Sequence, residues 1–187
     1  MASASSLAHL KSRRREDYRY LLDYRTRWND NDMYHHMNNA VYNFLFDSIV
    51  NAYLIDECGL HPPTSAEHPL VAHLHTDFFS SISYPAVAEL GLRVNKLGRS
   101  SVSYEIGLFE KGIDSVRAVG EFVHVWVQRV TGRPAPTGMS DGLREGLEKI
   151  YVATDSMTGS TAGSRSSIGH ISGDGGRKGR DDRNSKL

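Results

Sequence analysis

The sequence predicts an α+β domain in which one antiparallel sheet wraps around a single long helix. Three features of the 187 residues lead to this fold class: a strand-like segment near the N-terminus, then a long helical segment, then four strand-like runs joined by short turns. The helical segment is apolar on nearly every side, which is typical of a helix buried against other elements. A chain of this length suffices for one domain with a sizeable core.

The first strand is expected at residues 22–28, because large side chains alternate there with charged ones: Leu22, Tyr24, Thr26 and Trp28. A polar loop over residues 29–37 separates this strand from the helix. Apolar residues then recur at helical spacing as far as Ile55. Asn38 or Asn39 can cap the start of this helix, and Gly59 can end it.

Four further strands are expected at residues 70–79, 87–97, 101–110 and 116–130. Short glycine-containing segments, Gly98-Arg99 and Gly112-Ile113-Asp114, supply the turns that hairpins between the last three strands require. The final run is apolar on both faces, which favours a central position in the sheet: Phe122, Val123, Val125, Trp126 and Val127. A short helix at residues 141–151 is expected to close the domain.

The composition of the chain sets the limits of the domain. Residues 1–19 are predicted to form a flexible basic arm, residues 20–152 the folded domain, and residues 153–187 a disordered tail rich in Gly, Ser, Arg and Asp. The tail ends in Ser185-Lys186-Leu187, the tripeptide that the peroxisomal import receptor reads. We therefore expect a peroxisomal protein. Cytoplasmic and mitochondrial localisation are the alternatives, and the mitochondrial one rests on the serine-rich, basic N-terminus.

Charge and composition argue against several classes of partner. The chain has 22 basic and 22 acidic residues, so no basic face for nucleic acid is expected. No apolar run approaches the roughly 18 residues that span a membrane. A single cysteine, Cys58, excludes an intrachain disulfide and a zinc site of several cysteines. His73, His75 and Asp77 alternate as metal ligands could, but nothing completes such a site, and we expect neither metal nor cofactor.

The polar loop and the start of the helix carry the clearest functional motif. It reads Asp30-Asn31-Asp32-Met33-Tyr34-His35-His36-Met37-Asn38-Asn39 and is followed by Tyr42 on the helix. This resembles the signature of the hot-dog thioesterases related to 4-hydroxybenzoyl-CoA thioesterase, in which Asp-x-Asp ends a strand and Gly-His-Val-Asn-Asn opens a helix. The resemblance covers about residues 20–152. It implies a hot-dog fold, acyl-CoA as the substrate, and a homodimer or homotetramer with active sites at its interfaces.

The chemistry of thioester hydrolysis fits this loop. The reaction needs a base or nucleophile near the carbonyl carbon and hydrogen-bond donors for the developing oxyanion. A carboxylate beside a helix N-terminus supplies both, because the first N–H groups of a helix have no intrahelical partner. The resemblance places the catalytic carboxylate at Asp32, as general base or as nucleophile, with Asp30 as the fallback. Alternatively, both aspartates only cap the loop.

The resemblance also indicates further site residues. His36 either donates to the thioester oxygen, holds Asp32, or only fixes the loop. His35 stands where the family usually has glycine; it is a candidate substrate contact, as are Met37 and Asn39, although Asn39 also suits a helix cap. The resemblance implies that the turn with Arg99, Ser100 and Ser101 lies beside the pantetheine arm, often from the partner subunit; alternatively, Arg99 is only a solvated turn residue. A non-catalytic acyl-CoA binding module and a hot-dog hydratase or dehydratase are the alternative functions.

Overall fold

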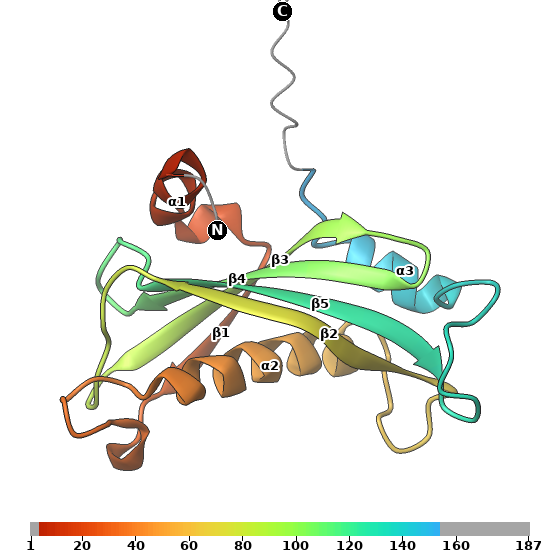
Figure 1. Cartoon of the computed structure of the whole chain (residues 1–187), viewed down its shortest axis with the longest axis horizontal. Helices are drawn as coiled ribbons and strands as arrows, with labels where there is room; N and C mark the ends of the chain where they lie inside the picture. Colours follow the sequence, from red (N-terminus) through yellow and green to blue (C-terminus); the bar gives the residue numbers. More distant parts are fainter. Residues whose placement is uncertain (1–3, 154–187) are drawn as a thin grey trace, which may run out of the picture. The chain divides into compact units, whose positions relative to one another are not determined.

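A computed structural model describes residues 4–153 of the chain. Its five strands form one antiparallel sheet in the order β1-β3-β4-β5-β2, as Figure 1 shows. The strands are β1 Tyr20–Arg25, β2 Glu67–Phe78, β3 Val87–Leu97, β4 Ser101–Glu110 and β5 Ala118–Gln128. The predicted α+β arrangement is confirmed, and β5 is an interior strand as expected. The predicted tail, apart from Ala153, lies outside the described residues, so the import tripeptide stays a prediction.

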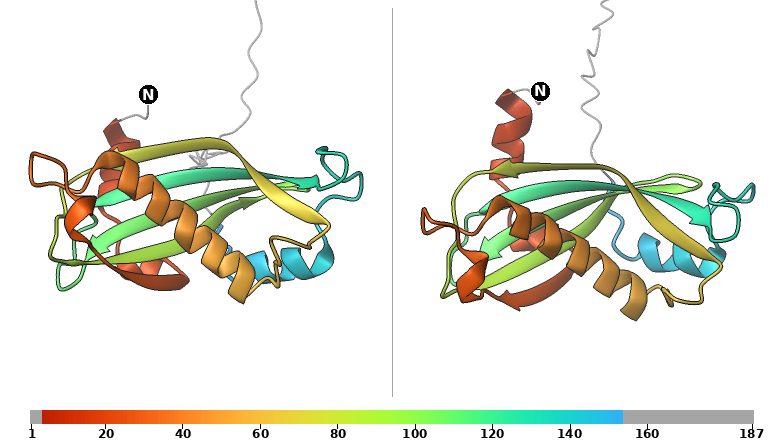
Figure 2. Two further views of the ribbon diagram at one scale, coloured as in Figure 1. Left: turned by 90° about the horizontal axis from the view of Figure 1, so that it is seen from below. Right: turned by 60° about the horizontal axis from the view of Figure 1, so that its bottom comes forward.

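Helix α2, Asn39–Asp56, packs against one face of the sheet, which we call the inner face (Figures 1 and 2). Its start is fixed by Asn38, whose side-chain oxygen accepts a hydrogen bond from the Ala40 N–H at 2.9 Å. Seven side chains of the helix are buried: Tyr42, Leu45, Phe46, Ile49, Val50, Tyr53 and Leu54. The helix is not buried all round, however. Phe44 is 72% exposed, because the side of α2 facing away from the sheet meets no other described element.

The expectation of a flexible arm at residues 1–19 is wrong for the residues that the structure describes. Residues Ala4–Lys11 form helix α1, and Arg15–Asp17 form a 3-10 helix on the opposite, outer face of the sheet (Figure 1). Tyr18 is 5% exposed and lies flat on two glycines of the sheet. A Cβ atom at Gly91 would come within 2.6 Å of the Tyr18 ring, and one at Gly107 within 2.5 Å. The two glycines therefore make room for the ring.

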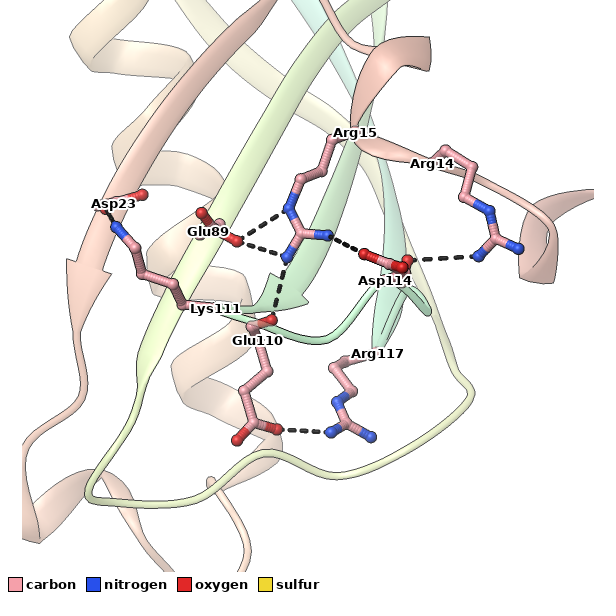
Figure 3. A network of polar contacts seen from close by, with 8 residues as sticks. All are labelled: Arg14, Arg15, Asp23, Glu89, Glu110, Lys111, Asp114 and Arg117. Atoms are coloured by element: carbon pink, nitrogen blue, oxygen red, sulfur yellow. Dashed lines mark hydrogen bonds and ion pairs between the residues drawn. The ribbon is translucent and has the colours of Figure 1, made fainter.

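Charged side chains also hold this N-terminal segment against the sheet (Figure 3). Arg15 forms an ion pair with Glu89 on β3 and donates to the Glu110 carbonyl on β4 at 3.0 Å. Its guanidinium also lies over the Phe109 ring, 4.8 Å from the centroid. Arg14 donates to the carbonyl of Asp114 in the turn between β4 and β5 at 3.4 Å. The basic residues expected to be solvated thus have specific partners.

The ends of the other elements differ modestly from the prediction. Strand β1 ends at Arg25, and Trp28 lies in a 3-10 helix, Trp28–Asp30, where it is 80% exposed rather than half-buried. Helix α3, Asp141–Glu148, ends before Tyr151 and buries Leu143 and Leu147 in the core beside the end of α2. None of the described helices is long and apolar enough to cross a membrane.

Candidate active site

The loop between β1 and α2 is anchored by Asp30, which is 1% exposed. Its Oδ2 accepts a hydrogen bond from the Arg27 backbone N–H at 2.7 Å, and its Oδ1 accepts two from the Arg27 guanidinium at 2.9 and 3.1 Å. The Tyr24 hydroxyl donates to Oδ2 at 3.4 Å, and the Asn38 N–H donates to the Asp30 carbonyl at 2.8 Å. Both carboxylate oxygens are thus used within the loop, so Asp30 positions the motif.

Asp32 has a different environment, because it is partly exposed at the tip of the same loop. Its Oδ1 accepts hydrogen bonds from the backbone N–H groups of Tyr34 at 2.8 Å and His36 at 3.2 Å. The Asp32 N–H in turn donates to the His36 carbonyl at 2.8 Å. Its Oδ2 accepts no hydrogen bond from residues 4–153. The carboxylate is therefore held by one oxygen and keeps the other available.

The two histidines of the loop contribute through their backbone. His35 has a φ of 62°, the left-handed conformation that favours glycine, which is the residue that the resemblance leads us to expect at this position. The His35 N–H donates to the Asp32 carbonyl at 3.3 Å. His36 is exposed, and it holds Asp32 through its backbone N–H rather than through its ring. Both imidazoles are left accessible to a ligand.

A cavity of about 310 Å³ adjoins this loop at the N-terminus of α2. Three of the predicted site residues, His36, Met37 and Asn39, contribute to its wall. Tyr42, the last residue of β2 and the segment after that strand complete it: Phe78, Phe79, Ser80 and Ser81. Met37 is 1% exposed and belongs mainly to the core, whereas Asn39 is the exposed first residue of α2. The cavity thus combines apolar walls with the polar end of a helix, as small-molecule sites do.

The sequence did not reveal the segment after β2, since residues 78–81 are far from the loop in sequence. Two hydrogen bonds join the loop to the residues just after this segment: the Met37 N–H donates to the Ile82 carbonyl at 2.8 Å, and the Tyr84 N–H donates to the side-chain oxygen of Asn31 at 3.0 Å. The sequence showed only that a turn follows the apolar end of the predicted strand at residues 70–79. It did not indicate that this turn would lie against the loop before the long helix.

The turn with Arg99, Ser100 and Ser101 lies elsewhere in the chain. It joins the C-terminal end of β3 to β4, whereas β1 and its following loop pair with the opposite end of β3 at Val87. Arg99 donates to the Pro136 carbonyl at 2.9 Å, and the Met139 N–H donates to the Arg99 carbonyl at 3.0 Å. One protomer therefore does not bring these residues to Asp32.

The fold and the motif loop together define a class of protein, the hot-dog thioesterases, and comparison with known proteins agrees. The sequence model of the thioesterase-like superfamily matches residues 26–147, so the chain belongs to this superfamily. The matched region runs from the end of β1 through most of α3. No protein in a search of curated sequences matches.

Solved structures extend the comparison. The PA5185 protein of Pseudomonas aeruginosa is 40% identical, with a TM-score of 0.71 over 75% of this chain and 98% of its own. A Thermus thermophilus thioesterase complexed with coenzyme A and Zn is 27% identical, with a TM-score of 0.61 over 72% of this chain and 96% of its own. The SAV2348 protein of Staphylococcus aureus in complex with CoA has a TM-score of 0.65 at 16% identity, over 80% and 95% of the two chains, which shows a shared fold. The predicted hot-dog fold is confirmed.

Proposed function

We propose that this protein hydrolyses acyl-CoA thioesters to the free acid and CoA, with Asp32 as the catalytic carboxylate. The observation that carries the proposal is the asymmetry of Asp32: backbone N–H groups hold Oδ1, whereas Oδ2 accepts no hydrogen bond within residues 4–153. Asp32 itself does not line the cavity at the start of α2, but His36 and Met37 of the same loop do. The coenzyme A bound to the related Thermus thermophilus thioesterase supports CoA as the carrier. Asp30 is the weaker candidate, because Arg27 and Tyr24 occupy its carboxylate.

Asp32 Oδ2 can act in either of two ways. It can take a proton from a water molecule that attacks the thioester carbonyl, or it can attack that carbon itself and form an anhydride that water then cleaves. In both routes the carbonyl oxygen becomes negative and is stabilised near the first turn of α2 at Asn39, where the helix dipole favours negative charge. The Asn38 side chain already accepts the Ala40 N–H of this turn. The thiolate leaves without a strong general acid, since a thiol has a pKa of about 8.5.

We further propose that the site is completed by a second copy of the chain. Strand β2 is an edge of the sheet and exposes apolar side chains that are each about half accessible: Leu70, Val71, Leu74 and Phe78. Such an edge is a template for pairing with another strand. If two β2 strands pair antiparallel, the Glu67 end of one meets the Phe78 end of the other. The partner's Arg99 turn then approaches the Asp32 loop, because β2, β5 and β4 carry it at the Glu67 end.

The direct test is free-thiol release from a panel of short, long and aromatic acyl-CoAs. Asp32→Asn is expected to lower kcat by on the order of 10²–10⁴-fold, the usual range for a catalytic acid or base. Asp47→Asn, which changes an exposed carboxylate on α2, is the matched control and should keep the wild-type rate. Wild-type turnover in a folded Asp32→Asn protein would refute the assignment. Binding of acyl-CoA without release from any member would instead establish the binding-module alternative.

A mixing experiment tests the shared site. Arg99→Ala is expected to raise KM for acyl-CoA and to leave kcat nearly unchanged, because arginine suits phosphate and is far from the reacting bond. Co-refolding Asp32→Asn chains with Arg99→Ala chains then gives mixed dimers. If Arg99 serves the partner's Asp32, one of the two sites in each mixed dimer is intact, and wild-type KM returns at half the sites of the mixed dimers, about a quarter of all sites in an equimolar mixture. If both residues serve the same chain, no intact site forms, and the low-KM activity stays absent.

Peroxisomal localisation remains part of the proposal, supported by Ser185-Lys186-Leu187. A fluorescent protein fused ahead of the chain should appear in puncta that coincide with a peroxisomal marker. Deleting Leu187 should spread it through the cytoplasm. Puncta that persist after the deletion would contradict import through this tripeptide.

A further inference from the structure

One wall of the cavity beside the motif loop, residues 78–81, is held in place by a residue that does not itself line the cavity. Arg117 directly precedes β5, and its backbone carbonyl accepts the N–H groups of Phe79 at 2.8 Å and Ser80 at 3.0 Å. Its guanidinium Nη1 also donates to Ser80 Oγ at 2.7 Å. The backbone and the side chain of Arg117 therefore both bond to this wall.

The Arg117 guanidinium is held in turn by Glu110, the last residue of β4. Glu110 Oε2 accepts a hydrogen bond from Arg117 Nη2 at 2.6 Å, and the Arg117 side chain is 15% exposed. The Glu110 carbonyl accepts a hydrogen bond from Arg15 at 3.0 Å, as Figure 3 shows. Because a guanidinium is planar and rigid, its bond to Glu110 through one nitrogen fixes the direction in which the other nitrogen reaches Ser80.

The charge of Arg117 also acts on a second part of the cavity wall. Tyr42 lines the cavity from α2. Burial raises the pKa of the Tyr42 hydroxyl, whereas a hydrogen bond with the Ile82 backbone and the charge of Arg117 act to lower it. The guanidinium is therefore near two parts of the wall that belong to different elements, one on α2 and one after β2.

The same cavity is where the proposed hydrolysis places the reacting end of the substrate, because His36 and Asn39 at the start of α2 also line it. Reacting groups must be held about 3–3.5 Å apart in the correct orientation, and a displacement of about 1 Å can lower the rate on the order of 10²-fold. A residue that fixes the cavity wall therefore influences the reaction without touching the substrate.

We infer that Arg117 is a positioning residue for the hydrolysis: through Ser80 it sets the position of residues 78–81 relative to the start of α2, and Glu110 orients its guanidinium. The inference rests on the proposed function. Arg117 acts on the acyl end of the substrate, so its loss affects kcat rather than the binding of CoA.

Thiol release from acyl-CoA gives kcat and KM for Arg117→Gln and Glu110→Gln. We expect Arg117→Gln to lower kcat by about ten- to hundredfold and to change KM by less than about threefold. Glu110→Gln should lower kcat less, by about three- to tenfold, since an amide oxygen still accepts from Arg117 but without the opposite charge. Lys111→Gln is the matched control, because it removes a charge of the same network that pairs with Asp23, and it should keep wild-type kcat and KM.

Ser80→Ala tests the route by which Arg117 acts, and it changes an exposed residue, so it serves even if Arg117→Gln does not fold. If Arg117 acts through Ser80, Ser80→Ala lowers kcat by a similar factor, and the double variant is no slower than Arg117→Gln alone. Losses that multiply in the double variant overturn the inference. So do wild-type kcat in folded Arg117→Gln or Ser80→Ala, a loss confined to KM, and an equal loss in Lys111→Gln.

The wild type distinguishes failure of this inference from failure of the proposed function. A wild type that releases no thiol from any acyl-CoA refutes the hydrolysis, and the inference with it. An active wild type beside an equally active, folded Arg117→Gln protein overturns the inference alone. Urea unfolding of each variant establishes that the protein is folded under the assay conditions.

Discussion

The two faces of the sheet each bury an ionisable group, and they stabilise it in opposite ways. On the outer face, Glu105 on β4 is 4% exposed and receives two hydrogen bonds from the Arg13 guanidinium at 2.7 and 3.0 Å. Asn95 donates to it at 2.9 Å, and the Tyr18 hydroxyl at 3.2 Å. On the inner face, His124 on β5 is 2% exposed, and its Nδ1 has no partner in the described part of the chain.

The presence or absence of hydrogen-bond partners determines whether Glu105 and His124 are charged. Burial acts to raise the pKa of Glu105, but the hydrogen bonds from Arg13 and Asn95 and the charge of Arg13 outweigh it, so the pKa is lowered and the carboxylate is ionised. Burial alone lowers the pKa of His124 to about 4, so that imidazole is neutral. A buried charge is thus retained where partners surround it, and is absent where they do not.

The largest effect is expected from breaking the outer-face pair. Glu105→Gln leaves the Arg13 guanidinium buried without its counter-charge, and loss of one member of such a pair costs about 3 kcal/mol or more in the free energy of unfolding. Urea unfolding at pH 7 measures this. Glu121→Gln is the control, because Glu121 lies directly opposite Glu105 on β5 but is exposed. An equal loss in both variants would show that the pairing with Arg13 is unimportant.

The pH dependence of the same variant sharpens the comparison. Because the pKa of Glu105 is lower in the folded than in the unfolded protein, its contribution is complete above about pH 4.5 and is lost as the pH falls through the folded value. The stability difference between wild type and Glu105→Gln should therefore shrink below about pH 4.5. A difference that stays constant to pH 3 would contradict an ionised Glu105.

Protonation of His124 on the inner face is expected to lower the free energy of unfolding at a higher pH than protonation of Glu105 does. His124 binds a proton near pH 6.5 in the unfolded chain but only near pH 4 in the folded one. Stability is therefore complete above pH 6.5 and falls as the pH drops towards 4, by about 3 kcal/mol at roughly 1.4 kcal/mol per pH unit. His124→Phe should remove this slope. Tyr104→Phe, which removes a neighbouring buried hydroxyl, should keep it, and a steep slope in both variants would rule out His124 as the cause.

The sequence predicted the inner face better than the outer one. Regular periodicity and the Gly98 turn predicted β3 and β4 with the bounds that the structure has, and the two cap candidates, Asn38 and Asn39, predicted the start of α2, where the structure uses Asn38. These features depend on residues near one another in sequence. Arg13 and Glu105 are 92 positions apart, so no local pattern could pair them. A basic run is usually solvated, which made the N-terminal segment look like a loose arm.

The motif of the candidate site was also predicted from residues that are near one another in sequence. What depends on residues far apart in sequence was again not predicted. The spacing of Asp30, Asp32 and Asn38 is local, and all three lie in the loop that the motif indicated. The resemblance placed the catalytic carboxylate at Asp32 with Asp30 as the fallback, but no local pattern indicated that Asp30 is buried, because burial depends on the tertiary fold. Strand glycines such as Gly107 were an unused signal, since a glycine inside a strand often marks close approach of another group.

A smaller effect is expected where the outer-face contacts reach the surface. The Arg15 side chain is 23% exposed, pairs with Glu89 and lies over Phe109. Arg15→Lys keeps the charge but loses the planar contact with both partners, so we expect a loss of about 1 kcal/mol in urea unfolding. Arg15→Ala should cost little more. If lysine restored full stability, charge alone would account for the contact, and the ring would contribute nothing.

The smallest effect is expected at the solvent-exposed margin of the same network. The Lys111 ammonium lies 2.9 Å from Asp23, but more than half of each side chain is exposed, so water and salt screen the pair. Lys111→Ala also keeps the backbone hydrogen bond from residue 111 to the Val87 carbonyl. We therefore expect its unfolding midpoint in urea to match that of wild type within the scatter of repeated measurements, at low and at high salt. A clear loss at low salt that disappears at high salt would mean that the charges of Figure 3 act as one coupled set. In that case burial would no longer suffice to rank the contributions of the charged residues on the outer face.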